Sequence, residues 1–421
     1  MKNKFVFIIL IFAGTISSYA SNITVCNTCK IKSIQKAIEI APIHSVIVIK
    51  SGTYFEHNIK IDKPLTLKGE NNPVIDGEHK GYVLDVAADS ISIIGLTIRN
   101  VGQSYTKDYA AIRLYKSHNF TLTGNRLENV FFGFLIEKSN GGLINNNIVS
   151  SKAIEEYNSG NGIHLWHCNS VKVHDNEAFG LRDGIYFEFV KNSLIYNNHS
   201  HDNLRYGLHF MFSNKNEYYH NVFETNGAGV AVMFSKYIKM HHNIFTKNWG
   251  GASYGLLLKE IYDAEIHDNE FSENTIAINA EGCTRINYIS NEFRNNGWAI
   301  KIVGACYLNI FTKNNFLYNS FDLSYNSKLN DNSFNGNYWS ANTTYDLDKN
   351  GIGDVPFRPV KLFNYVVNKT PESIVLLRSL FIDILDFSEK VSPVFTPDEI
   401  KDNSPLMNKL PFELKFNKKT K

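Results

Sequence analysis

YGLHFMFSNKNEYYHNVFETNGAGVAVMFS, residues 206–235, contains one pattern twice. Gly207 is followed by Leu-His-Phe-Met, and Gly229, 22 residues later, is followed by Val-Ala-Val-Met. In the first copy apolar residues occupy every second position, which is the period of a strand with one buried face. An Asn-rich stretch separates the two copies, and Asn favours turns. The stretch therefore indicates a strand-and-turn unit of about 22 residues that repeats.

The same unit recurs along most of the chain. The first Asn of an Asn-x-x-x-x-Asn pair occurs at Asn198, Asn221, Asn243, Asn269, Asn291, Asn314 and Asn337, and Asn125, Asn147 and Asn176 continue the register upstream. A small residue opens a short strand with the same period at Ala111, Gly133, Gly162, Gly184, Gly207, Gly229, Gly255, Ala277 and Ala299. The two markers share one period and the same insertions, near residues 151–160 and 248–253, and so predict a solenoid.

A period of about 22 residues predicts a parallel β-helix, because helical repeats need about 34 residues or more. Each unit holds two or three short strands, such as Gly184-Ile-Tyr-Phe-Glu followed by Ser193-Leu-Ile-Tyr. Each strand would pair with its counterpart one coil away, at about 4.8 Å. The crossover rule then predicts an all-β, right-handed parallel β-helix. We expect the repeated Asn residues to occupy left-handed corners and to bond to one another from coil to coil.

The register assigns side chains to the inside or the outside of the coils. The first and third positions after the small residue are apolar, as in Ile185/Phe187 and Leu208/Phe210, and we expect them to fill the core. The column eight residues before each repeated Asn holds three of the five cysteines, which we expect to be small buried residues: Cys168, Cys283 and Cys306.

Four regions follow from these patterns. Residues 1–20 have a basic start, an apolar run and small residues at the end, as a cleaved secretory signal peptide does. Residues 21–45 are expected to form an N-terminal cap with a helix over 31–41, and residues 46–345 the β-helix. Residues 346–421 are expected to hold an Asp-rich loop, an amphipathic helix over 371–391 and an extended arm. That helix is too apolar to stand alone, so it must pack on the last coil or on a partner.

The outward columns bring together ligands that suit a soft metal ion. His164 and His209 share the column two residues after the small residue, and Met211 and Met233 share the column four residues after it. Thioether and imidazole ligands suit Cu(I). The competing interpretation is that the methionines lie under a loop or against another protein, because Met is common at adaptable interfaces.

Three further motifs could hold a metal ion. His220 and His242 share a column beside the Asn corner and could chelate an ion, although solvated corner histidines are commoner. Cys26-x-x-Cys29 follows the cleavage site, where a local disulfide and a Cu(I) thiolate pair are the two interpretations. The loop DLDKNGIGD offers oxygens at Asp346, Asp348, Asn350 and Asp354, which fits either a structural calcium site or an Asx-rich turn.

A β-helix is also the fold of many enzymes that act on polysaccharides, so a lyase or epimerase of uronate polymers is the alternative function. Such a site needs clustered carboxylates with a base or an arginine. Arg182 and Arg205 are stacked, with Asp183 and Glu188 nearby, although these residues could equally form a salt-bridged surface. The net charge of +2 indicates no nucleic-acid partner.

The chain resembles the NosD family, the periplasmic β-helix proteins needed to mature nitrous oxide reductase. The residues that carry the resemblance are NGIHLWHCNSVKVHDNEAFGLRDGIYFEF (161–189), RYGLHFMFS (205–213), GAGVAVMFSKYIKMHHN (227–243) and LLRSLFIDILDFSEKVSPVFTPDEI (376–400). The resemblance runs from the capping helix to SPLMN (404–408), essentially the whole mature chain.

The resemblance implies a periplasmic accessory protein and not a free-standing enzyme. Family members work with an ATP-binding-cassette transporter, made of a cytoplasmic ATPase and a membrane permease, to build the copper–sulfide centre of the reductase. A small lipoprotein chaperone hands over the copper. On this basis the helix over 371–391 and the arm after it would dock on the permease, and His209, Met211 and Met233 would receive or pass on Cu(I). The family pattern gives no role to Cys26 and Cys29.

Overall fold

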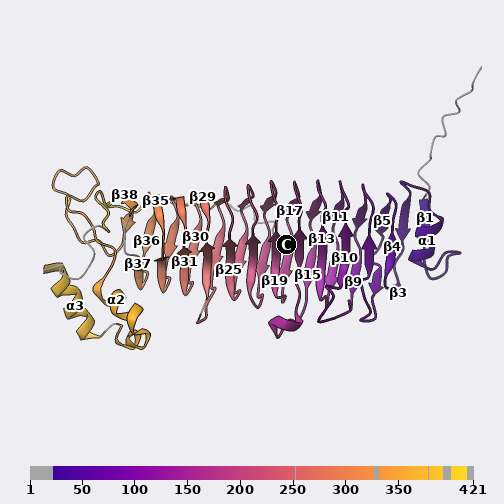
Figure 1. The fold of residues 1–421 in the computed structure, drawn as a ribbon, viewed down its shortest axis with the longest axis horizontal. Helices are drawn as coiled ribbons and strands as arrows, with labels where there is room; N and C mark the ends of the chain where they lie inside the picture. The colour runs from indigo at the N-terminus through magenta and orange to yellow at the C-terminus, as the bar shows by residue number, and fades with distance from the viewer. Residues whose placement is uncertain (1–21, 252, 327–330, 378, 392–399, 415–421) are drawn as a thin grey trace, which may run out of the picture.

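The coils of the chain stack into one long solenoid. A computed structural model describes residues 22–251, 253–326, 331–377, 379–391 and 400–414. The stacked coils lie between helix α1 (Ile34–Ile40) at one end and helices α2 (Leu362–Lys369) and α3 (Leu380–Val391) at the other (Figure 1). The predicted all-β, right-handed parallel β-helix is confirmed. The predicted signal peptide, residues 1–20, lies outside the described residues.

Three parallel sheets run along the solenoid, and each complete coil contributes one strand to each sheet. Sheet A has 14 strands within the described residues, in the order β1 (Asn22–Val25), β2 (Val46–Ile49), β5 (Thr66–Gly69), β8 (Ser92–Ile94), β11 (Thr121–Thr123), β14 (Leu143–Asn145), β17 (Lys172–His174), β20 (Leu194–Tyr196), β23 (Glu217–Tyr219), β26 (Lys239–His241), β29 (Tyr262–His267), β32 (Thr284–Ile289), β35 (Tyr307–Thr312) and β38 (Asp331–Asn335).

Sheet B has 13 strands in the described part of the chain. Their order is β3 (Thr53–Phe55), β6 (Val74–Asp76), β9 (Thr97–Arg99), β12 (Arg126–Glu128), β15 (Ile148–Ser150), β18 (Glu177–Phe179), β21 (His199–His201), β24 (Val222–Glu224), β27 (Ile244–Thr246), β30 (Glu270–Ser272), β33 (Glu292–Arg294), β36 (Asn315–Leu317) and β39 (Tyr338–Trp339).

Sheet C has 12 strands over the same described ranges and includes the strands that open with the small residue. Their order is β4 (Ile59–Ile61), β7 (Leu84–Val86), β10 (Ala110–Tyr115), β13 (Phe132–Glu137), β16 (Ile163–Trp166), β19 (Asp183–Glu188), β22 (Tyr206–Met211), β25 (Ala228–Met233), β28 (Tyr254–Lys259), β31 (Ile276–Glu281), β34 (Trp298–Val303) and β37 (Phe321–Asn326).

The core contains the columns that the register predicted. Ile185, Phe187, Leu208 and Phe210 are fully buried, and the three column cysteines, Cys168, Cys283 and Cys306, are buried and unpaired. Aromatic rings also stack from coil to coil inside the solenoid, and the ring centroids of Phe245 and Phe271 lie 4.5 Å apart. Repetition of one side chain in register therefore gives each ring a face to pack against.

The repeated Asn residues form a buried ladder along the solenoid. The side-chain oxygen of Asn243 accepts the backbone N–H of Asn221 at 3.0 Å, and the amide of Asn243 donates to the side-chain oxygen of Asn269 at 3.0 Å. The predicted bonding from coil to coil is confirmed. The predicted left-handed corner is wrong by one residue, because the residue before the ladder Asn takes positive φ, for example 53° at His220. An Asn inside the coil satisfies backbone donors that water cannot reach.

Both ends of the solenoid differ from the prediction. The N-terminal helix is shorter than residues 31–41, because Ser33 caps it by accepting the N–H of Lys36. The single helix expected over 371–391 is instead a 3₁₀ helix η2 (Pro371–Leu376) followed by α3. Helix α2, which the sequence did not predict, packs Phe363 and Val367 with Ile382 of α3 against Phe321 of the coils.

The C-terminal arm lies on the last coil within the described residues. Asp402 is fully buried, and one of its carboxylate oxygens accepts the N–H of Asn337 at 2.9 Å and the indole N–H of Trp339 at 3.0 Å. Its other oxygen accepts the N–H of Gly336 at 3.0 Å. Asp402 therefore takes the place that the next ladder Asn would occupy and ends the ladder.

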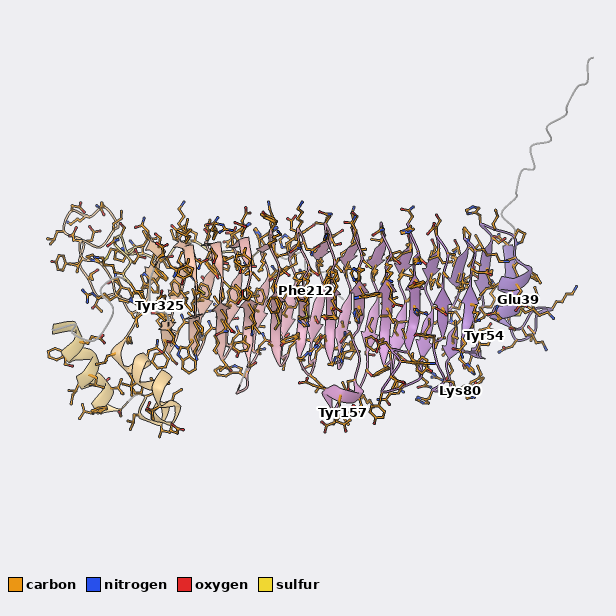
Figure 2. The ribbon with its side chains drawn as sticks, in the orientation of Figure 1. Glu39, Tyr54, Lys80, Tyr157, Phe212 and Tyr325 are labelled. Atoms are coloured by element: carbon orange, nitrogen blue, oxygen red, sulfur yellow. A yellow bond between two sulfur atoms is a disulfide. The ribbon has the colours of Figure 1, made fainter. Side chains whose placement is uncertain are left out.

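One insertion projects from the side of the coils. It holds the short 3₁₀ helix η1 (Glu156–Asn158), and Tyr157 lies at its tip, whereas Phe212 lies on the coils themselves (Figure 2). The ring of Tyr157 stacks on Tyr105 from another loop, with centroids 6.5 Å apart. The insertion predicted near residues 151–160 is therefore a loop that leaves the coil register intact on both sides.

Candidate metal sites on the outer faces of the coils

The outer face of sheet C places Met211 and Met233 side by side. Met211 in β22 pairs directly with Met233 in β25, and His209 pairs with Ala231, so the predicted columns are confirmed. Adjacent coils lie about 4.8 Å apart, which brings the two thioether side chains within reach of one ion. Both methionines are half-buried, and the hydroxyl of Tyr186 lies 3.8 Å from the sulfur of Met211.

His209 lies next to the methionines under a cover of aromatic rings. Its ring centroid lies 4.7 Å from Tyr186 and 4.8 Å from Tyr206, and only 5% of the residue is exposed. Its Nδ1 lies 3.5 Å from the carboxylate of Asp183, which is an ion-pair distance but too long for a good hydrogen bond. Among the described residues neither ring nitrogen of His209 has a hydrogen-bond partner. A buried imidazole with unused nitrogens is uncommon and needs an explanation.

His164 shares the column of His209 but lies two coils away. Tyr186 pairs with both and stands between them, with its ring centroid 4.6 Å from that of His164. Burial, together with the nearby charge of Arg182, lowers the pKa of His164 to about 3. The imidazole of His164 is therefore neutral at any pH near 7, but the coil spacing separates it from the methionines.

This burial predicts a pH dependence of stability. A histidine whose folded pKa is depressed keeps the fold stable above its unfolded pKa, about 6.5, and costs stability as pH falls toward the folded pKa, about 3. Between pH 7 and pH 4 the loss from His164 is on the order of 3 kcal/mol. Leucine already occupies this column at Leu135 and Leu257, so His164→Leu is a compatible substitution. We expect the urea midpoint of His164→Leu to fall less between pH 7 and pH 4 than that of the parent protein. If the urea midpoints of the two proteins fell in parallel with pH, the lowered pKa of His164 would not be the cause of the loss.

An exposed aromatic ladder borders the two methionines. Phe189, Phe212 and Phe234 stack with centroids 5.2 and 5.1 Å apart, and each follows the outward residue Glu188, Met211 or Met233. Each of the three has φ between 51° and 54°, a conformation that is unusual for a bulky residue. This ladder gives the methionine pair an apolar border on one side.

Asp183 and Arg205, two of the residues of the alternative polysaccharide-acting site, form a buried ion pair. Asp183 has no exposed surface, and its two oxygens accept the Nε and Nη2 of Arg205 at 2.8 and 2.6 Å. Burial raises the pKa of Asp183, but the hydrogen bonds from Arg205 and its charge outweigh it and hold the pKa at about 2. Arg182 instead donates to Asn161 at 3.2 Å. Asp183 is therefore covered and a weak base, as the salt-bridge interpretation predicts.

The corner histidines form a group on sheet A. The ring centroids of His220 and His242 lie 5.1 Å apart on adjacent coils. Ligand atoms of His242, His267 and Asp268 lie within 4.8 Å of one another. The structure thus places His220 beside His242, as the column implies, and adds His267 and Asp268 of the next coil, which were not among the predicted ligands. A chelate at this corner stays a prediction.

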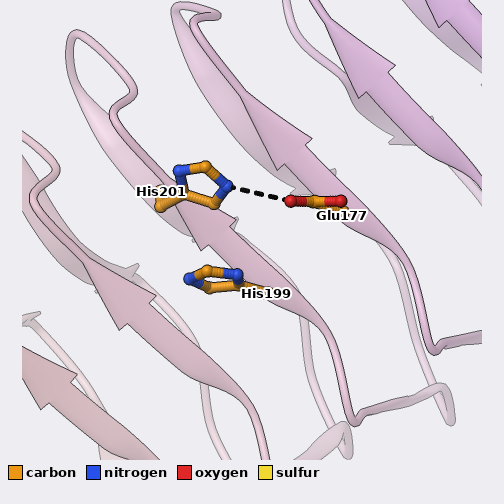
Figure 3. Close-up of side chains that lie close together, drawn as sticks. All are labelled: Glu177, His199 and His201. Carbon is orange, nitrogen blue, oxygen red and sulfur yellow. Dashed lines mark hydrogen bonds and ion pairs between the residues drawn. The ribbon is translucent and has the colours of Figure 1, made fainter. Parts of the chain in front are cut away.

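A second group lies on sheet B and was missed as a site. Ligand atoms of Glu177, His199 and His201 lie within 4.8 Å of one another. His201 reaches from β21 toward Glu177 on β18, with His199 beside it (Figure 3). The signal in the sequence is that Glu177 and His199 are one period of 22 residues apart, with a second histidine two residues further on.

In two of the predicted metal motifs the proposed ligand atoms are bonded to other groups of the protein. Cys26 and Cys29 are joined by a disulfide, so the interpretation as a Cu(I) thiolate pair is corrected: the sulfurs are used by the bond. In the Asp-rich loop Asp346 accepts the N–H of Gly351 at 2.8 Å, and Asp354 accepts that of Leu347 at 2.7 Å. These bonds form an Asx-rich turn with Asp348 and Asn350, and the calcium site stays a prediction.

Comparison with known proteins identifies related sequences. A family model described as periplasmic copper-binding protein (NosD) matches residues 144–346. A probable ABC transporter binding protein NosD of Pseudomonas aeruginosa is 27% identical over 83% of this chain and 85% of the relative. The protein of the same description from Stutzerimonas stutzeri is 26% identical over 85% of this chain and 86% of the relative. The matched region includes every outer-face histidine and methionine discussed above.

Solved structures with a similar backbone include enzymes that act on polysaccharides. A family 28 exopolygalacturonase of Yersinia enterocolitica has a TM-score of 0.56 and 12% identity, over 74% of this chain and 79% of that chain. The A-module of the mannuronan C-5 epimerase AlgE6 of Azotobacter vinelandii has a TM-score of 0.50 and 12% identity, over 73% and 96%. At this identity the likeness shows the fold alone.

Proposed function

Because the chain belongs to the NosD family, we propose that it is a periplasmic copper-binding accessory protein that receives Cu(I) and passes it on during assembly of the copper–sulfide centre of nitrous oxide reductase. The observation that carries the proposal is the direct pairing of Met211 with Met233 beside His209, within the region that the family model matches. Relatives named as binding proteins support an accessory function.

The chemistry of this outer face suits a transient Cu(I) site. Thioether sulfur and imidazole nitrogen are ligands that Cu(I) accepts, and all three candidates are uncharged when they bind it. A Cu(I) ion bound to a ring nitrogen of His209 would explain why this imidazole is buried without a hydrogen bond. The two methionines are half-buried, so a partner can reach the ion and remove it. The Phe189, Phe212 and Phe234 ladder would exclude water on one side.

The C-terminal helices supply a surface for the transporter. Leu380, Phe381, Ile384 and Phe387 of α3 are exposed, although they are large and apolar. An exposed patch of this kind marks a protein interaction site. We propose that this patch docks on the permease, which in turn binds the ATPase. The outer face of sheet C would then contact the copper-chaperone lipoprotein and the reductase. None of the helices in the described part of the chain has the length and apolar character to cross a membrane itself.

The site is tested by anaerobic Cu(I) titration against a competing chelator. We expect Met211→Leu/Met233→Leu, which keeps side-chain volume but removes both thioethers, to bind Cu(I) at least about 100-fold more weakly than the parent chain. Met407→Leu, on the C-terminal arm, is the matched control and should bind as the parent does. Equal Cu(I) affinity in the double variant and the parent would show that Met211 and Met233 do not bind the ion.

A further inference from the structure

Sheet B carries a cluster of nitrogen and oxygen ligands without sulfur. Glu177 of β18 pairs with His199 of β21, and Phe179 pairs with His201, so all four side chains point outward from two adjacent coils. His199 and His201 are two residues apart on one strand and therefore lie on the same face. This face is not the one that holds Met211 and Met233, which belong to sheet C.

The three ligand atoms already converge. Nε2 of His201 lies 3.4 Å from the carboxylate of Glu177, the rings of His199 and His201 have centroids 4.2 Å apart, and all three ligand atoms fall within 4.8 Å (Figure 3). The ring of Phe179 stacks on His201 at 5.0 Å and limits its rotation. The cluster is thus assembled by the coil register and held by packing.

Asp202 sets the orientation of the His201 ring. Its carboxylate lies 2.7 Å from Nδ1 of His201, so that nitrogen carries the proton and donates it. In the neutral ring Nε2 then presents a lone pair to the carboxylate of Glu177, and either a second proton on the ring or a bound cation between the two atoms relieves this contact. A carboxylate behind a histidine that faces a metal is the usual arrangement around metal-binding imidazoles.

His199 completes the set with an unused nitrogen. Its Nε2 is buried and has no hydrogen-bond partner in the described part of the chain. A carboxylate oxygen of Glu224 lies 3.6 Å from this nitrogen, and the other oxygen of Glu224 lies 3.1 Å from the ammonium of Lys247. A buried ring nitrogen without a hydrogen-bond partner is unfavourable, and in the tautomer that leaves Nε2 unprotonated a metal ion would satisfy it.

We propose that Glu177, His199 and His201 form a second metal site, which binds Zn²⁺ through two imidazoles and one carboxylate. Nitrogen and oxygen ligands of this kind, with water in the remaining position, suit Zn²⁺, whereas the thioether pair on sheet C suits Cu(I). The site is independent of the copper proposal, because it shares no ligand with it. Because its ligands lie on adjacent coils, a bound ion would link β18 to β21. The protein would then have two metal sites that select different ions.

The test is a titration of metal-free protein with Zn²⁺ against a chromophoric chelator, repeated with Co²⁺ to read ligand-field absorption. We expect one equivalent of Zn²⁺ to be lost, or bound at least about 100-fold more weakly, in His199→Asn/His201→Asn. His174→Asn is the matched control, because His174 also has an aspartate at its Nδ1, 2.6 Å away, and stacks on a neighbouring ring, Tyr196, at 4.5 Å. It should bind as the parent does.

Other outcomes separate this site from its neighbours. Zn²⁺ binding that survives in His199→Asn/His201→Asn but is lost in His267→Asn would overturn the assignment in favour of the corner group. Equal loss in the His174→Asn control would also overturn it. The Met211→Leu/Met233→Leu protein should keep full Zn²⁺ affinity, so the copper proposal and this one can fail separately. Circular dichroism of each variant checks that the coils remain folded.

Discussion

Asn243→Leu is expected to destabilise the solenoid by about 3–5 kcal/mol, because it removes four buried hydrogen bonds at once. The side-chain oxygen of Asn243 accepts both the N–H and the amide of Asn221, each at 3.0 Å. Its own amide donates to the carbonyl of Tyr218 and to Asn269, each at 3.0 Å. Leu has a similar shape but cannot replace any of these bonds, and the N–H of Asn221 would be left buried without an acceptor.

The measurement is the urea midpoint of the variant relative to the parent. Asn408→Leu provides the control, since Asn408 is an exposed residue of the arm, and such a change usually alters stability by less than about 0.5 kcal/mol. Equal midpoints for Asn243→Leu and Asn408→Leu would mean that the ladder contributes little and that ring stacking alone holds the coils in register.

Asp183→Ala is the second change with a large expected effect, about 3–5 kcal/mol, because it leaves the partly buried guanidinium of Arg205 unpaired. The chain offers a close match on its surface. Arg285 binds Asp263 through the same two nitrogens at 2.6 and 2.9 Å, again 22 residues apart, but the Arg285 side chain is 50% exposed against 31% for Arg205. Asp263→Ala should cost no more than about 1 kcal/mol.

A double variant distinguishes charge from packing. Asp183→Leu/Arg205→Leu removes both charges, and we expect it to recover much of the stability that Asp183→Ala loses, because buried pairs can be replaced by apolar residues at little cost. Thermal and urea denaturation of the three proteins measure this. If the double variant is as unstable as Asp183→Ala, the loss comes from packing around His209 and Tyr206 and not from the unpaired charge.

The coil register was predictable from the sequence because similar environments repeat every 22 or 23 residues outside the insertions near residues 151–160 and 248–253. The pairing of Met211 with Met233 follows directly from that spacing. Burial was harder to predict: the ladder Asn residues were assigned to corners, whereas the residue before each one turns the chain. A polar residue type does not reveal whether water or a buried donor satisfies it.

Features that join different columns were missed for another reason. The Glu177, His199 and His201 group combines two positions on one strand with one on its neighbour, and a search along single columns does not detect it. Helix α2 and the buried role of Asp402 lie outside the repeat, so periodicity carries no information about them. The disulfide between Cys26 and Cys29 was one of two interpretations that the spacing allowed.

The carboxylate that ends the Asn ladder has a consequence for the order of events during biogenesis. Asp402 lies 65 residues after Asn337, the residue whose amide it accepts. Because the chain is synthesised from its N-terminus, the last coil and helices α2 and α3 are therefore made before the group that completes them. Until residue 402 arrives, the N–H groups of Gly336 and Asn337 and the indole of Trp339 have no internal acceptor. Closure of the solenoid is thus a late event in the synthesis of the chain, because its last ladder acceptor follows the helices in sequence.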